Sequence, residues 1–277
     1  MTGKRAHLPS GRSVQLSVSG EQARIVPDEH GEGWVLEIGG ALQSHVDLQN
    51  PGAIRYEYLR RMANVLDVGW SPAQPISILH LGAGALTLPR YVQWTRPGSG
   101  QTVVELEREL PSLVLAELPP PEGTDLTVVI GDARAELEQL REPRFDAVVL
   151  DIGTDADAAA HLTGAEFYGE LLNQLTETGV LLINIGDEKG LRFLAQQARA
   201  LEKAAADVGL SGAWTLADTS MLDRLQTDNA VLAAGGAVTE WEQESLRSEL
   251  LAAGPHPAAV LDPAQTMALA ERIQSRD

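Results

Sequence analysis

The chain has 277 residues, enough to bury a full core in one large domain or in a large domain with a small appendage. Its 21 Lys and Arg residues are outnumbered by 39 Asp and Glu residues, so the formal net charge is −18 at pH 7, which repels a nucleic-acid backbone and favours cationic or neutral ligands. The sequence has no cysteine, which excludes disulfides, zinc–thiolate sites and cysteine nucleophiles.

The apolar segments and the spacing of the histidines exclude further classes of protein. The first thirty residues hold no apolar segment of signal-peptide length, and no later stretch approaches the roughly 20 apolar residues of a membrane span. The six histidines show no metal-ligand spacing such as HExxH, and no GxSxG sequence marks a hydrolase nucleophile. We therefore expect a cytoplasmic protein without a metal site, whose partners include neither nucleic acid nor membrane.

Residues 10–50 predict β-hairpins, because short alternating stretches such as "VQLSV", "ARIV" and "WVLEI" are separated by the turn-rich "PDEHGEG". We expect a small N-terminal β-hairpin domain over residues 1–52 and a larger domain with C-terminal helices over 53–277. Apolar residues at helical spacing predict a helix over 53–67, and "GWSPAQP" after it predicts a loop. The apolar residues of this helix are Ile54, Tyr58, Met62, Val65 and Leu66.

Seven apolar runs of strand length come next along the chain. They are "ISILHLG", "TVVELE", "LTVVIG", "FDAVVLD", "GVLLINI", "AWTLAD" and "NAVLAAG". Continuous apolar runs are typical of strands buried on both faces of a parallel sheet, and helical patterns such as 191–208 separate most of them. The sequence therefore predicts an α/β fold with a doubly wound, seven-stranded Rossmann-like sheet. Two terminal helices are expected over 239–254 and 263–274.

Acidic residues end three consecutive strands of this predicted sheet. Ligands bind at the carboxyl ends of the strands in an open parallel sheet, so the residues that end each run are the informative ones. Gly82 and Gly84 come after the first run, and acids close the next three. These acids are Glu105 or Glu107, then Asp132, then Asp151.

The segment "GAGALT" has two interpretations. It lacks the Gly-Lys-Ser/Thr of a Walker loop and the third glycine of the dinucleotide fingerprint, which disfavours a phosphate ligand. Its glycines either let the backbone approach a ligand or form a tight turn between strand and helix. Glu105 lies 21 residues past Gly84, a spacing typical of an acid that accepts hydrogen bonds from ribose, with Glu107 as the alternative.

Asp132 and Asp151 differ in the residues that come after them. Asp132 precedes "ARAELEQL", so it either caps that helix or accepts a hydrogen bond from an adenine amino group. Asp151 ends the fourth run in "FDAVVLDIGTD", with no evident helix starting directly after it. A functional role is therefore favoured for Asp151.

The ordered segments "LHLGAGALTLPRYV", "VVELERE", "VVIGDAR" and "FDAVVLDIGTDADAAAHLTGAEFY" closely resemble the spermidine synthase (polyamine aminopropyltransferase) family. The resemblance covers roughly residues 30–235 and is strongest from Asp151 to "EFY" at 166–168. It implies that residues 53–277 form a methyltransferase-type, Rossmann-like nucleoside-binding catalytic domain, preceded by a small β-domain. It also implies a homodimer, which is usual for the family.

The resemblance also implies site residues. Asp151 falls on the catalytic aspartate that takes up the amine proton, Glu105 on the ribose-binding acid, and Asp132 with Ala133 on the pair that holds the adenine. The glycines Gly82 and Gly84 belong to the nucleoside loop. In the segments "GGALQSHVD" and "IRYEYL", Gln43 falls on the glutamine near the nucleoside sulfur and Tyr56 on the tyrosine of Tyr-His-Glu.

Several substrate-binding positions depart from the family pattern. Ala85 stands where the family has the aspartate that anchors the amine of the aminopropyl group, and Glu57 replaces a histidine. Thr154 replaces the second aspartate of the catalytic segment, with Asp155 next to it, and Ala158 replaces a proline. We expect Glu57, Thr154 and Asp155 at the acceptor end, where an acid such as Asp155 or Glu57 holds the distal ammonium.

Three functions are consistent with these residues. The first is aminopropyl transfer from decarboxylated S-adenosylmethionine, as co-substrate, to a polyamine such as putrescine or to another amine. The second is methyl transfer from S-adenosylmethionine itself, because Ala85 lacks the charge that would select against the carboxylate. The third is a catalytically silent nucleoside-binding homologue. None of the three requires a metal.

Overall fold

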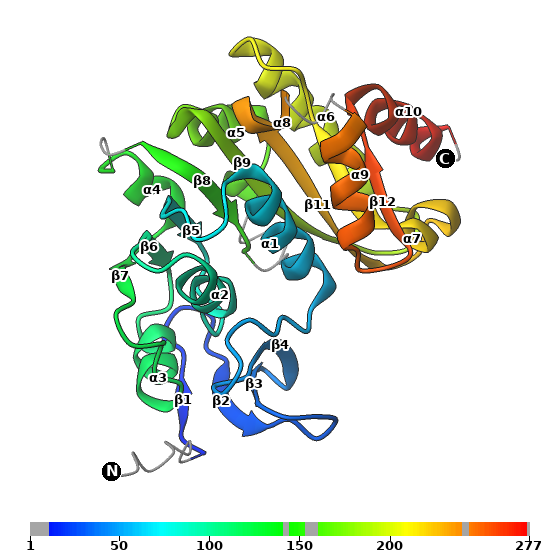
Figure 1. Ribbon diagram of the computed structural model, residues 1–277. Helices are drawn as coiled ribbons and strands as arrows, with labels where there is room; N and C mark the ends of the chain where they lie inside the picture. The colour runs from blue at the N-terminus through cyan, green and yellow to red at the C-terminus, as the bar shows by residue number, and fades with distance from the viewer. Residues whose placement is uncertain (1–10, 141–143, 153–159, 240–243, 276–277) are drawn as a thin grey trace.

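The computed structural model of the protein describes residues 11–140, 144–152, 160–239 and 244–275 (Figure 1). In this part of the chain, eight strands form one large sheet in the order β12-β10-β11-β9-β8-β5-β6-β7. Four more strands form a small sheet in the order β1-β2-β3-β4, which lies below the large sheet in Figure 1. The predicted α/β fold with a small N-terminal β-domain is confirmed.

The small sheet is antiparallel, and its strand β2 alternates buried with exposed residues. Its strands are β1 (Ser13–Gln15), β2 (Gln22–Pro27), β3 (Trp34–Ile38) and β4 (Ala41–Val46). In β2, Ala23 and Ile25 are fully buried while their neighbours Arg24 and Gln22 face solvent. This period of two is expected for a sheet with one face on a core and one face in water.

The large sheet contains all seven predicted strands and one more. Its strands are β5 (Ser77–Leu81), β6 (Gly100–Glu105), β7 (Asp125–Ile130), β8 (Phe145–Leu150), β9 (Leu175–Asp187), β10 (Trp214–Asp218), β11 (Asp228–Gly235) and β12 (Ala258–Leu261). Strands β5 to β9 run parallel, whereas β11 is antiparallel to both of its neighbours. The additional strand β12 pairs antiparallel with β10 at the edge, and its four residues are too few to give a periodic signal.

Helices cover both faces of the large sheet. They are α1 (Glu57–Gly69), α2 (Thr87–Thr95), α3 (Glu109–Glu117), α4 (Ala133–Leu137), the 3₁₀ turn η1 (Ala160–Leu162), α5 (Ala165–Leu172), α6 (Arg192–Asp207), α7 (Thr219–Arg224), α8 (Gly236–Thr239), α9 (Glu244–Ala253) and α10 (Pro263–Gln274). Helices α1, α2 and α9 pack on one face, and α5, α6 and α10 on the other. Within the described ranges, no helix is both long and apolar enough to cross a membrane.

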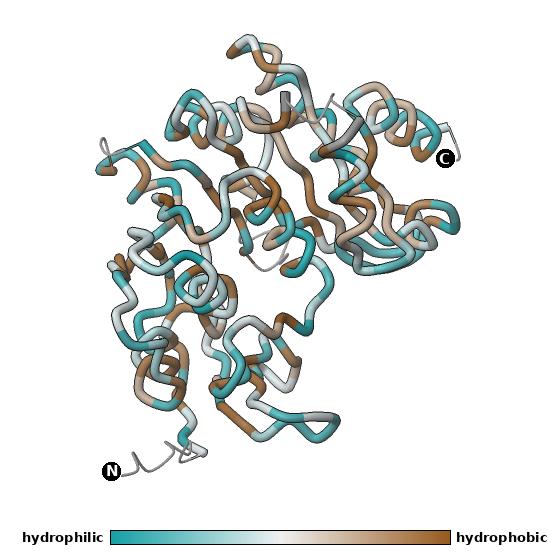
Figure 2. The backbone as a smooth tube through the Cα atoms, viewed as in Figure 1, coloured by the Kyte–Doolittle hydropathy of each residue, from teal (hydrophilic) through white to brown (hydrophobic). Residues whose placement is uncertain are grey.

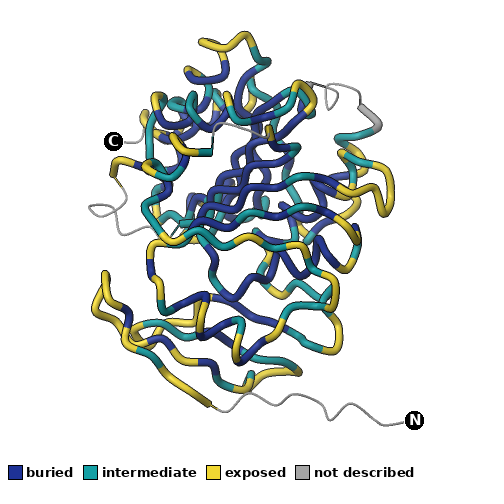
Figure 3. Tube along the Cα trace, turned by 90° about the vertical axis from the view of Figure 1, so that its left-hand side faces the viewer, coloured by how far each residue is buried: buried dark blue, intermediate teal, exposed yellow. Residues whose placement is uncertain are grey.

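The central strands are buried from both sides, as their continuous apolar sequences predict. Ile78 packs into the core on the α1 face, while its neighbour Leu79 packs into the core on the α6 face. Hydrophobic segments concentrate along these strands (Figure 2), and the same strands form the buried centre of the molecule in Figure 3. Each fully buried leucine or isoleucine stabilises the fold by about 1.5–3 kcal/mol relative to exposure.

Helix α1 starts later than the sequence predicts. Residues 53–56 precede it, and Tyr56 is its extended N-cap residue, with ψ 125°. The apolar pattern extends to Ile54 because this residue packs against the same core without being helical. At the other end, the buried guanidinium of Arg96 donates to the carbonyl oxygens of Leu66 and Trp70 and so satisfies the last turn of the helix.

The two expected terminal helices have different outcomes. Helix α10 spans the predicted residues, and Asp262 caps it by accepting from the backbone N–H of Gln265. The helix predicted over 239–254 is present as α9 from Glu244 to Ala253, while Thr239 ends the preceding helix α8 and residues 240–243 lie outside the described residues.

Hydrogen bonds join the small sheet to the end of the large one. The Ser44 hydroxyl of β4 accepts from the backbone N–H of Ala85 at 3.2 Å. The Glu107 carboxylate accepts from the backbone N–H groups of Val18 and Ser19, at 2.9 and 2.6 Å, in the turn before β2. These contacts place the small sheet beside the carboxyl ends of β5 and β6.

Replacing Gly82 tests how closely these strand ends pack. Gly82 has a φ of +100°, and an added Cβ would collide with the carbonyl oxygen of Asp151. Gly190 has a similar φ of +105° but open space around it, so it serves as the control. We expect Gly190→Ala to lower the free energy of unfolding by about 1–2 kcal/mol and Gly82→Ala by about 3 kcal/mol or more, measured by urea denaturation. Equal losses would mean that only the backbone conformation matters.

Candidate active site

A cavity of about 850 Å³ opens at the carboxyl ends of the strands, between the large and the small sheet. All predicted site residues that fall within the described part of the chain line this cavity. These are Gln43, Tyr56, Glu57, Gly82, Gly84, Glu105, Asp132, Ala133 and Asp151. The predicted acceptor residues Thr154 and Asp155 lie outside the described residues. The volume of the cavity lies in the range typical of small-molecule sites.

The glycine turn after β5 forms one wall of the cavity. Gly82 and Gly84 both have positive φ values, +100° and +48°, and an added Cβ on Gly84 would lie 2.7 Å from the Ser44 hydroxyl. The backbone N–H of Gly82 donates to the carbonyl oxygen of Val104, which continues the pairing with β6. The glycines are therefore needed for a tight turn, and the turn itself borders the cavity.

The two acids after β6 have separate environments. Glu105 accepts from the backbone N–H groups of Ala83 and Glu107, both at 2.9 Å, and burial raises its pKa. Its carboxylate thus lies across the glycine turn and borders the cavity. Glu107, the alternative from the sequence, also lines the cavity, but both of its oxygens bind the turn that carries Val18 and Ser19.

Asp132 is the N-cap residue of α4, as one of the two interpretations predicts. Its Oδ1 accepts from the backbone N–H groups of Arg134 and Ala135 at 3.1 and 3.0 Å. Its Oδ2 lies 2.6 Å from Nε2 of His161, a residue that sequence reasoning did not select. Asp132 also lines the cavity, so capping does not remove it from the site.

Asp151 is held by donors from two other elements. The Tyr58 hydroxyl of α1 donates to its Oδ2 at 3.2 Å, and Nδ2 of Asn184 in β9 donates to its Oδ1 at 2.8 Å. Nδ2 of Asn229 in β11 donates in turn to Oδ1 of Asn184 at 2.9 Å. Burial in the cavity wall raises the pKa of Asp151 although both donors oppose this.

Sequence reasoning missed three of these contacts. Tyr58 was predicted only as an apolar position of a helix, and its ring does pack against that core. Asn184 carried a usable signal, because it is the polar residue within the apolar run "GVLLINI". Asn229 carried none, since it sits at the start of β11, where polar residues are common.

The cavity has a strongly negative lining. Seven carboxylates line it, and Arg55 is the single cationic side chain among its described lining residues. The carboxylates are Glu21, Glu57, Glu105, Glu107, Asp132, Asp151 and Asp228. Arg55 pairs with Asp28, and Glu57 pairs with Arg61 at 2.9 Å. A cleft lined by one sign of charge concentrates ligands of the opposite sign, so this one favours cations.

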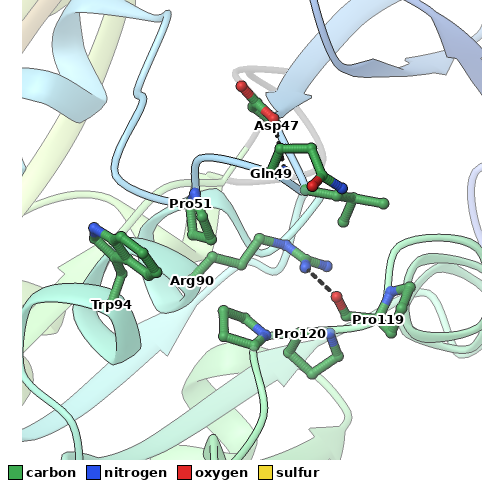
Figure 4. A pocket seen from close by; sticks show the side chains of 9 residues that line it. Asp47, Gln49, Pro51, Arg90, Trp94, Pro119 and Pro120 are labelled. Atoms are coloured by element: carbon green, nitrogen blue, oxygen red, sulfur yellow. Dashed lines mark hydrogen bonds between the residues drawn. The ribbon is translucent and has the colours of Figure 1, made fainter. Parts of the chain in front are cut away.

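A second hollow of about 310 Å³ lies away from the strand ends, among Trp94, Pro51 and Pro119–Pro121 (Figure 4). Arg90 crosses it, and its guanidinium donates to the carbonyl oxygens of Ala85, Leu118 and Pro119. Burial lowers the pKa of Arg90 to about 10. This arginine links the end of α3 to the loop after β5, which is a structural role. Within the described ranges, no group of three or more His, Asp or Glu residues is arranged to hold a metal ion.

Comparison with known proteins agrees with this architecture. No protein-family model matches the chain, and no curated protein sequence does. Among solved structures, it resembles a "probable spermidine synthase from Corynebacterium glutamicum ATCC 13032", with 26% identity, a TM-score of 0.79, and coverage of 95% of this chain and 94% of the other.

Two further solved structures show the same fold at lower identity. A spermidine synthase solved with the transition-state analogue AdoDATO has 14% identity and a TM-score of 0.61, with 89% of this chain and 85% of the other covered. Human methyltransferase-like protein 13, solved with SAH, has 16% identity and a TM-score of 0.53, with 80% and 92% covered. The resemblance inferred from the sequence motifs is therefore confirmed.

The raised pKa of the Asp151 carboxyl group can be tested by measuring the free energy of unfolding of Asp151→Asn at several pH values. The folded state disfavours the charged form, so the amide should raise the free energy of unfolding at pH 7 by on the order of 1 kcal/mol. The gain should be full above the folded pKa, shrink as pH falls through it, and vanish below the pKa of about 3.9 of a free aspartate. Urea unfolding at pH 7, 5 and 3.5 measures it, with exposed Asp223→Asn as the control. A gain independent of pH would contradict the raised pKa.

Proposed function

We propose that this divergent spermidine synthase-like protein is an aminopropyltransferase, which moves an aminopropyl group from decarboxylated S-adenosylmethionine to an amine such as putrescine. The observation that carries the proposal is the position of Asp151, a half-buried carboxylate that is one of seven acids lining a cavity with a single described arginine. Both proposed substrates are cations, and this lining favours cations. The likeness in fold to spermidine synthases supports the same reaction class.

The nucleoside would occupy the side of the cavity formed by the glycine turn. Glu105 lies beside this turn with its carboxylate fixed by two backbone N–H groups, and is assigned to the ribose hydroxyls. Asp132 and Ala133 are assigned to the adenine, whose amino group would share or displace the contact between Asp132 and His161. Gln43 and Tyr56 border the same cavity from the small sheet and the start of α1, and are assigned to the sulfur end.

The reaction is an in-line displacement at the carbon beside the sulfonium. The lone pair of the neutral amine forms the new C–N bond while the C–S bond breaks. The electron pair of the C–S bond goes to sulfur, which leaves methylthioadenosine. The proton released by the amine goes to the Asp151 carboxylate. Positioning the two substrates can contribute about 7–11 kcal/mol, and general base catalysis about 10²–10⁴-fold in rate. A raised pKa makes Asp151 a better proton acceptor than a free aspartate.

Methyl transfer from S-adenosylmethionine is the second candidate. Ala85 is buried in the glycine turn and brings no charge to the methionine end of the nucleoside. Arg55 lines the cavity and is a group that a substrate carboxylate could pair with, although Asp28 already holds it. A catalytically silent nucleoside-binding protein is the third candidate, motivated by the same replaced positions.

Calorimetric titration separates the first two candidates. The purified protein is titrated with decarboxylated S-adenosylmethionine, S-adenosylmethionine and methylthioadenosine, each with and without putrescine. We expect the decarboxylated form to bind more tightly than the intact one, because the carboxylate of the intact form is repelled by the acidic lining. Tighter binding of S-adenosylmethionine would instead favour methyl transfer, and binding of none of them would contradict a nucleoside site.

Asp151→Asn separates catalysis from binding. The amide keeps the shape of the side chain but accepts no proton, so turnover should fall by about 10²-fold or more while methylthioadenosine binds as before. Product formation is followed by chromatography and binding by calorimetry, with Asp223→Asn as the charge control outside the cavity. Unchanged turnover would remove Asp151 from the mechanism. Absence of turnover in the wild-type protein with every amine tested would favour the silent homologue.

A further inference from the structure

Two asparagine side chains form a chain of hydrogen bonds behind Asp151. Nδ2 of Asn229 donates to Oδ1 of Asn184 at 2.9 Å, and Nδ2 of Asn184 donates to Oδ1 of Asp151 at 2.8 Å. These hydrogen bonds run from β11 through β9 to Asp151, which directly follows β8, and the three strands are neighbours in the sheet. In the register of β9 and β11, Asn184 lies opposite Val231 and Asn229 lies opposite Gly186, so the two amides meet diagonally on one face.

The carboxylate determines the direction of both amides. An ionised carboxylate only accepts hydrogen bonds, so Asn184 has to turn its NH₂ group toward Asp151. Its carbonyl oxygen then points the other way and requires a donor, which Asn229 supplies. If that donor were lost, the Asn184 amide could rotate and present its oxygen to Asp151, and two acceptors would face each other.

We propose that Asn229 is a positioning residue for the Asp151 carboxylate, acting through Asn184. It fixes the Asn184 donor on Oδ1, while Tyr58 donates to Oδ2. The carboxylate is thereby kept in one orientation, with its remaining lone pairs open to the cavity. The catalytic part of this inference rests on the proposed function, whereas the effect on the Asp151 carboxyl group does not.

The groups near Asp151, apart from Asn229, come from several other elements. Tyr58 from α1 and Asn184 from β9 contact the carboxylate, and the Gly82 turn packs against its backbone. The remaining charged residues of the cavity lining are Glu21, Arg55, Glu57, Glu105, Glu107, Asp132 and Asp228. None of these charged groups is altered by an uncharged substitution of Asn229, so the double-mutant cycle with Asn184 decides whether a shift in the titration of Asp151 passes through the two amides.

Asn229→Leu is the main test, because leucine has a similar size and neither donates nor accepts. We expect the acidic limb of the pH–rate profile to shift to higher pH by about one unit. At a fixed pH on this limb, turnover would then be about tenfold lower than in the wild-type protein. The KM for the nucleoside should stay the same. Carboxyl ¹³C NMR titration of Asp151, assigned with Asp151→Asn, should show the same upward movement without any need for activity.

A double-mutant cycle tests whether Asn229 acts through Asn184. With Asn184→Ala in place, Asn229→Leu should add little or nothing to the shift, since the intermediate amide is already gone. Additive shifts would overturn the proposal. So would a changed KM with an unmoved Asp151 titration, because it would mean that Asn229 contacts the substrate directly.

A second variant guards against a folding defect. Asn229→Ala lacks the donor and adds no charge, so it should move the Asp151 titration in the same direction, and thermal unfolding checks that each variant is folded. If the wild-type protein has no turnover, the proposed function fails, while a shifted carboxyl titration still supports the positioning role. An unmoved titration in both folded variants overturns that role whatever the activity.

Discussion

The arrangement of the site depends on the close approach of the Gly82 turn to the backbone of Asp151. Asp151 donates its N–H to the carbonyl oxygen of Leu81, and Gly82 donates its N–H to that of Val104. These two bonds tie the ends of β5, β6 and β8 together at one level. A side chain on Gly82 would separate them, and the acids that end the strands would no longer surround one cavity.

Backbone N–H groups donate to three of the acids that line the cavity. Glu105 accepts from the glycine turn and from Glu107, Glu107 accepts from the turn before β2, and Asp132 accepts from the first turn of α4. Peptide dipoles stabilise a carboxylate without cancelling its charge as an arginine would. The acids are therefore fixed in place while the cavity keeps its negative potential for a ligand.

The small sheet completes the cavity that the large sheet begins. Ser44 holds the glycine turn, and the turn before β2 is fastened to Glu107, so both walls are set by the same few hydrogen bonds. Residues as far apart as Gln43 and Asn229 consequently line one space. Because the two walls share these bonds, loosening either sheet would change the width of the site as well as the stability of the fold.

The sequence predicts strands β5 to β11 and the acids that end three of them from local patterns, because continuous apolar runs report burial on both faces and ligands bind where parallel strands end. Its motifs also predicted the likeness to spermidine synthases and nine residues that line the cavity. Contacts between distant segments are visible only in the folded chain: Glu107 accepts from the turn before β2, Asp132 meets His161, and β12 extends the sheet. The two donors to Asp151 are likewise visible only in the folded chain, because Tyr58 is 93 residues away in sequence and Asn184 is 33 residues away. Periodicity predicts which residues are buried but not which of them contact one another.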